Sequence, residues 1–168
     1  MNLKTIVLTA TLALSSLTLA ANSDFLLTVT PDLTAQEYAA QSNMYLAQAQ
    51  IEYAFAYADL PLYNRAIANA EAAVRLEPTN PSYVQSAAML YATTQWWLPA
   101  HQHFATLRTL VTLDDATLDM AALTARKLGY MAMQSGDRSE ARTYYVQSLE
   151  YRDNESARQM LAKLENTL

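Results

Sequence analysis

Two histidines are the side chains best suited to acid–base chemistry or to metal binding. They are His101 and His103, with one residue between them. Residues two apart in a helix point to different faces, whereas a helical metal site needs ligands four positions apart. We therefore expect no metal site and place both side chains at the surface or between helix layers. An envelope hydrolase that pairs His101 or His103 with a nearby acid is a distant alternative.

Three neighbouring carboxylates form the next candidate group. Asp114, Asp115 and Asp119 could bind a cation, but a calcium loop also needs a glycine turn and a distal glutamate, and this segment has neither. The better interpretation is that Asp114 or Asp115 caps the start of a helix.

Composition disfavours most other catalytic chemistry. The sequence has no cysteine, so it has no thiol nucleophile and no cysteine-ligated zinc. Gly129 and Gly136 are its only glycines, too few for a phosphate-binding loop. The formal charge of −5, or −6 without the first twenty residues and their Lys4, disfavours nucleic acid as a partner. We predict a protein that is not an enzyme and needs no cofactor.

The first twenty residues have the pattern of a secretory signal. Lys4 supplies the positive charge, residues 6–19 form an apolar stretch, and Thr18-Leu19-Ala20 resembles a cleavage site. We expect export to the periplasm or the exterior, with no membrane span after cleavage. An uncleaved membrane anchor is the alternative.

The remaining chain is rich in helix-forming residues and repeats itself with a period of 34 residues. The matching positions share size or aromatic character: Tyr57 and Tyr91, Tyr63 and Trp97, Ala66 and Ala100, Ala70 and Phe104. A third copy follows at a spacing of 41 residues, measured from Ala100 to Ala141. The seven additional residues fall near positions 113–119 and predict a longer first helix in the third copy.

These residues resemble the tetratricopeptide pattern W-x2-L-G-x2-Y, then A-x3-F, then P. The best matches are Tyr53-Ala54, Tyr57, Ala66, Ala70 and Pro78 in the first copy, Ala87-Ala88, Tyr91, Ala100 and Phe104 in the second, and Leu128-Gly129, Ala141 and Tyr145 in the third. The resemblance implies an all-α solenoid of antiparallel helix pairs. We place the pairs at about 47–80, 81–113 and 114–153, within a domain of residues 34–168 that ends in a capping helix at 154–168.

Small and aromatic residues have separate roles in this scheme. Ala54, Ala88 and Gly129 are expected where the two helices of a pair cross, and Ala66, Ala100 and Ala141 where the second helix meets them. The aromatic residues expected to fill the space between layers are Tyr57, Tyr91, Phe104 and Tyr145.

The first helix is predicted to be unusually long. Thr34-Ala35-Gln36-Glu37 forms a capping box, and no proline or glycine follows before Pro61. A helix of about 25 residues would leave residues 35–46 overhanging their partner, after an extended or flexible lead at 21–33. Such an overhang could mediate a homodimer, which is our second hypothesis.

The resemblance implies that the first helix of each pair lines a concave groove. The expected groove residues are Gln48, Ile51, Phe55, Gln85, Met89, Arg126, Tyr130 and Met133. They form an apolar surface with amide edges that would suit a peptide. The alternative is that the first helix or the capping helix covers them. We also expect Trp97 in the core and Trp96 as a possible contact on the convex side.

The function that we predict is a non-catalytic protein–protein interaction module or adaptor of the cell envelope. Its partner would be a protein or peptide bound in the concave groove. The structural homodimer and the envelope hydrolase remain as alternatives.

Overall fold

The computed structural model describes residues 29–166, and this part of the chain contains helices and no strand. The predicted secretory signal and residues 21–28 lie outside the described residues. The helices are α2 (Ala35–Glu52), α3 (Pro61–Leu76), α4 (Pro81–Thr93), α5 (Trp97–Leu110), α6 (Asp115–Ser135), α7 (Arg138–Tyr151) and α8 (Glu155–Glu165). In this part of the chain, none of the helices combines the length and the apolar character that crossing a membrane would require.

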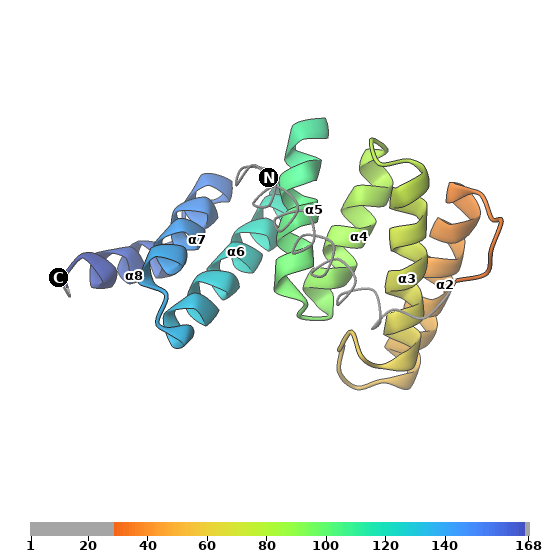
Figure 1. The fold of residues 1–168 in the computed structure, drawn as a ribbon, viewed down its shortest axis with the longest axis horizontal. Coiled ribbons are helices and arrows are strands. Elements are labelled where there is room, and N and C mark those ends of the chain that lie inside the picture. Colours follow the sequence, from red (N-terminus) through yellow and green to blue (C-terminus); the bar gives the residue numbers. More distant parts are fainter. Residues whose placement is uncertain (1–28, 167–168) are drawn as a thin grey trace, which may run out of the picture.

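The helices form three antiparallel pairs arranged in a row (Figure 1). α2 packs against α3, α4 against α5 and α6 against α7, and each pair contacts the next through its neighbouring helices. α8 packs on α7 at the end of the row. The predicted all-α solenoid of antiparallel helix pairs and its carboxyl-terminal capping helix are confirmed.

Local sequence sets where the helices begin. Thr34 and Glu37 form the predicted capping box, and the side chain of Asp114 accepts a hydrogen bond from the Thr117 amide, as expected for a cap. Other helices begin at the capping side chains of Asn80, Asp137 and Asn154. Gly136 ends α6 with a φ of 85°, a conformation that glycine adopts without strain. α6 has 21 residues, so the longer first helix of the third pair is also confirmed.

Small residues allow the helices to approach closely. Ala66, Ala88, Ala100 and Ala141 are buried as predicted, and so are the aromatic side chains of Tyr91, Phe104 and Tyr145. In the first and the third pair, a hydrogen bond also joins the two helices. The Ser42 hydroxyl donates to the Ala66 carbonyl in the first pair, and the Ser148 hydroxyl donates to the Ala122 carbonyl in the third, each over 2.8 Å. Both serines are buried, so these bonds fix the distance between the helices in the interior.

The first pair differs from the prediction. α2 ends at Glu52, and residues 53–60 form a connection to α3, so the first pair spans 35–76 rather than 47–80. Tyr53 leaves the helix in an extended conformation and packs its ring 6.0 Å from that of Tyr63. Ala54 is therefore exposed rather than at a helix crossing, and Tyr57 is 46% exposed rather than in the core.

The predicted overhang is also absent, because α2 packs along α3 from its first turns. Tyr38 is buried against Ala72 and Ala73, and its hydroxyl donates to the Thr30 carbonyl over 2.7 Å. Val29 and Leu33 pack against the same cluster. The lead is thus anchored on the first pair at Val29 and Leu33 rather than flexible at these two positions.

Gly129 provides the closest approach within the third pair. A Cβ atom at this position would lie 2.9 Å from Cε1 and 3.0 Å from Cδ1 of Tyr145, whose ring is fully buried. We expect Gly129→Ala to destabilise the fold by up to about 2 kcal/mol, because overpacking of about 1–3 kcal/mol outweighs the helix propensity gain of about 1 kcal/mol. Chemical denaturation measures this difference.

A double-mutant cycle provides the control. In a Tyr145→Leu background, which removes the ring atoms near Gly129, we expect Gly129→Ala to cost less or to stabilise. Equal costs in both backgrounds would contradict the assignment of the contact.

Candidate functional site

A groove lies between α2 and α4, the first helices of the first two pairs. Its volume is about 390 Å³, within the range of ligand sites. The residues that line it are Ser42, Asn43, Leu46, Gln50, Ser82, Gln85, Ser86, Met89, Leu90 and Thr93. We call this site the α2–α4 groove.

The α2–α4 groove combines an apolar centre with neutral polar edges. Leu46, Met89 and Leu90 provide the apolar surface, and Met89 and Leu46 are partly buried against the main core cluster. The remaining lining side chains carry amides or hydroxyls, and none is charged. Gln85 is held in place, because its Nε2 donates to the Thr117 hydroxyl of α6 over 2.9 Å.

The structure places two of the predicted groove residues, Gln85 and Met89, in this groove. Gln48, Ile51 and Phe55 do not line it: Ile51 is 88% exposed near the end of α2, and Phe55 is 70% exposed in the connection to α3. The lining face of α2 is instead formed by positions 43, 46 and 50, spaced by three and four residues. Sequence reasoning missed these positions because it continued the helix through Tyr57.

The capping helix takes up part of the third pair's predicted groove surface. Met133 packs in a cluster with Ala157 and Leu164 of α8. The Arg126 guanidinium donates to Oδ1 of Asn154, the residue that caps α8, over 3.3 Å. Met133 is thus packed toward the capping helix, and Arg126 is hydrogen-bonded to the residue that caps it.

Tyr130 is the remaining predicted groove residue. It stays half exposed, and its hydroxyl accepts a hydrogen bond from Gln134 over 2.6 Å. It lies on α6, away from the residues that line the α2–α4 groove.

The two tryptophans lie in different surroundings, and only Trp97 differs from its predicted role. Trp96 packs edge-on against Tyr91 at 5.5 Å and is partly buried against the main core cluster. Trp97 is only partly buried, and the Lys127 ammonium lies 5.8 Å from the centre of its ring. Trp97 is thus not a core residue, because Trp96 takes the inward-facing position beside Tyr91.

The two histidines point to different surroundings, as their spacing predicts. Nε2 of His103 lies 2.7 Å from Oε1 of Glu71, and its ring stacks on Tyr91 at 5.6 Å. His101 instead packs against Tyr144 and Tyr151 of α7, and burial lowers its pKa. Among residues 29–166, no three potential metal ligands come together.

Glu71, His103 and Tyr91 form the arrangement closest to a catalytic group, because a carboxylate orients an imidazole. The three residues come from α3, α5 and α4, and none of them lines the α2–α4 groove. Burial would raise the pKa of Glu71, but the hydrogen bonds from His103 and Tyr91 outweigh it and lower the pKa below 4.5. Burial and the Glu71 carboxylate raise the pKa of Tyr91. We interpret this group as a polar link between the first two pairs.

The pH dependence of stability tests this link. Because folding lowers the pKa of Glu71, its carboxylate stabilises the fold above the unfolded-state pKa, and this contribution is lost as the pH falls through the folded-state value. We expect Glu71→Gln to cost about 1.5–3 kcal/mol at pH 7 and progressively less as the pH falls below the ordinary pKa of a glutamate and then through the lowered folded-state pKa. Denaturation at several pH values measures the difference, with the exposed Glu52→Gln as control. A cost for Glu71→Gln that does not vary with pH would refute the interpretation.

Comparison with known proteins gives matches among solved structures alone. No family model and no curated protein matches the chain. Among solved structures, 17 chains match, including one described as the first TPR of Spaghetti (RPAP3) bound to the HSP90 peptide SRMEEVD. It is 18% identical, with a TM-score of 0.44, and the alignment covers 80% of this chain and 92% of that one. The bound peptide is a property of that structure, and the similarity concerns the helical architecture alone.

Proposed function

We propose that the protein is a non-catalytic interaction module that binds an extended peptide segment in the α2–α4 groove. The observation that carries this proposal is the lining of the groove, which combines apolar side chains with uncharged hydrogen-bonding side chains from both helices and contains no charged residue. Pockets of this composition position a ligand with a few polar contacts and bury its apolar groups.

The polar edges favour an extended segment over a helix. An extended peptide has free backbone N–H and C=O groups, whereas a helix uses these groups internally. Asn43 and Gln50 on one wall and Gln85 on the other carry amide groups that can both donate and accept hydrogen bonds. This arrangement suits a peptide backbone lying between α2 and α4.

The absence of charged side chains in the lining indicates which peptide sequences the groove would prefer. A buried charge without a partner is costly, so the segment inside the groove should be uncharged. Met89 has a flexible side chain that adapts to different shapes, which favours an apolar ligand residue at the centre. The expected ligand is therefore a short uncharged segment with one or two apolar side chains.

Compartment and assembly extend the proposal. We infer that the protein acts in the cell envelope, periplasmic or secreted, on the basis of the signal pattern in residues 1–20.

The homodimer alternative depends on an overhanging helix, and α2 has no such overhang. The hydrolase alternative pairs His101 or His103 with a nearby acid, and neither His101 nor the Glu71–His103 pair lines the α2–α4 groove.

A displayed library of random heptapeptides, selected on the purified protein, tests the groove. We expect the selected peptides to be uncharged at their centre and to lose affinity at least tenfold on Met89→Glu, which places a charge against the ligand. Ser86→Arg, at an exposed lining position, should weaken binding similarly by filling the groove. Fluorescence anisotropy measures both affinities.

The matched control is Met131→Glu, because Met131 is exposed on α6 and does not line the groove. It should leave the affinity unchanged. Selected peptides that bind all three variants as tightly as the unmodified protein would show that the groove is not the binding site.

A further inference from the structure

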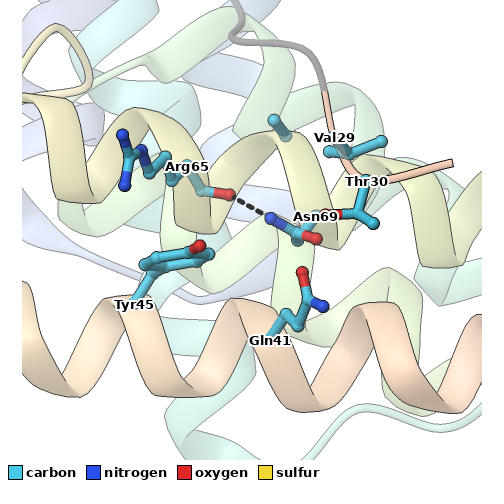
Figure 2. Close-up of a pocket in the computed structure, with 7 residues that line it drawn as sticks. Val29, Thr30, Gln41, Tyr45, Arg65 and Asn69 are labelled. Atoms are coloured by element: carbon cyan, nitrogen blue, oxygen red, sulfur yellow. Dashed lines mark hydrogen bonds between the residues drawn. The ribbon is translucent and has the colours of Figure 1, made fainter. Parts of the chain in front are cut away.

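A second cavity lies at the first helix pair, and it shares no lining residue with the α2–α4 groove. Its volume is about 210 Å³. The residues that line it are Val29, Thr30, Gln41, Tyr45, Arg65, Ala68 and Asn69, which come from α2, α3 and the segment before α2 (Figure 2). We call it the Asn69 cavity.

Asn69 has an unused hydrogen-bond acceptor in this cavity. The residue is 3% exposed, its Nδ2 donates to the Arg65 carbonyl over 2.8 Å, and its Oδ1 has no partner. Because the bond to a carbonyl requires the amide nitrogen, the side chain cannot be reversed to satisfy the oxygen. A buried acceptor without a donor is unfavourable, so a ligand that donates to Oδ1 would remove this cost.

Gln41 lies opposite Asn69. Figure 2 shows their carboxamides pointing toward one another from α2 and α3. A carboxamide both donates and accepts hydrogen bonds, so Gln41 can engage a second hydroxyl of a ligand held by Asn69. The pair therefore favours a ligand with hydrogen-bonding groups on two sides.

Arg65 supplies the only charge among the lining residues. Its guanidinium carbon lies 5.7 Å from the centre of the Tyr45 ring, and no acidic side chain lines the cavity. Arg65 and Asn69 are four residues apart in α3, so their side chains are neighbours on one face of the helix. The cavity thus has a cation and an unpaired acceptor among its lining groups, which matches a ligand that carries both a carboxylate and a hydroxyl.

Size and charge narrow the ligand class. A water molecule occupies about 30 Å³ in the liquid, so a cavity of this volume holds roughly seven to ten non-hydrogen atoms. Because no carboxylate lines it, a ligand ammonium group would find no counterion there, whereas a hydroxyl needs none. A hydroxy acid fits these conditions better than an amino acid.

We propose that the Asn69 cavity binds a small hydroxycarboxylate. The ligand hydroxyl donates to Asn69 Oδ1, and its carboxylate pairs with the Arg65 guanidinium. Gln41 holds a second polar group, and the carbon skeleton lies beside the Tyr45 ring. This site shares no lining residue with the peptide groove.

Isothermal titration calorimetry with glycolate, L-lactate, D-glycerate and L-malate tests the proposal, with L-alanine and L-serine as comparison ligands. We expect at least one hydroxy acid to bind more tightly than either amino acid. Arg65→Gln should weaken that binding about 10- to 100-fold, since a charged hydrogen bond is lost. Arg75→Gln, on an exposed position of the same helix outside the cavity, should have no effect.

Asn69→Leu distinguishes a binding role from a structural one. It removes the unpaired acceptor and keeps a similar volume, so it should abolish binding without lowering the Tm. Gln41→Leu, at a less buried position, should weaken binding and covers the case in which Asn69→Leu fails to fold. Absence of binding by all four hydroxy acids would mean that water alone satisfies Asn69. Tighter binding of an amino acid, or equal binding by Arg65→Gln, would also refute the proposal.

Discussion

The close approach of alanine-lined helices is the constraint on which the rest of this structure depends. Without cysteine, the chain cannot be stabilised by disulfides, so its pairs must be held by packing. The distance between packed helices depends on the side chains at the contact, and fully buried alanines such as Ala66, Ala88 and Ala100 permit short distances. The larger Phe104 and Tyr145 fill the remaining interior volume. The α2–α4 groove and the Asn69 cavity lie where the side chains do not fill the space between neighbouring elements.

The regular part of the fold could be predicted because its signals are local. Alanines and aromatic residues recur in α3 and α5 at 34-residue spacing, Asp114 caps α6, and Gly136 ends it. The end of α2 could not be predicted this way, since no proline or glycine marks it. Tyr53 leaves the helix to pack on Tyr63, a tertiary contact that overrides helical propensity. The match of Tyr57 to Tyr91 in sequence thus did not correspond to a match in structure.

The contrast between local sequence signals and tertiary contacts also explains which residues of the two candidate sites could be predicted. Gln85 and Met89 could be predicted because the helices of the second copy follow the 34-residue repeat. Asn43, Leu46 and Gln50 could not, because the sequence predicts that α2 continues past its actual end and so assigns the wrong residues of α2 to the groove. The Asn69 cavity has no sequence signature. Asparagine in the middle of a helix is ordinarily exposed, and its burial here depends on how α2 and residues 29–30 pack against α3. Only the tertiary structure reveals that its oxygen has no partner.

Three consecutive residues of α2 connect these features. Successive helical residues point about 100° apart, so Gln41 faces the Asn69 cavity, Ser42 faces α3, and Asn43 faces the α2–α4 groove. The buried bond from Ser42 to the Ala66 carbonyl therefore sets the position of α2 for both sites at once. A change in the distance between α2 and α3 would therefore alter both sites, because α2 contributes lining residues to each of them. The geometry of each site is thus a consequence of the packing that holds the first pair closed.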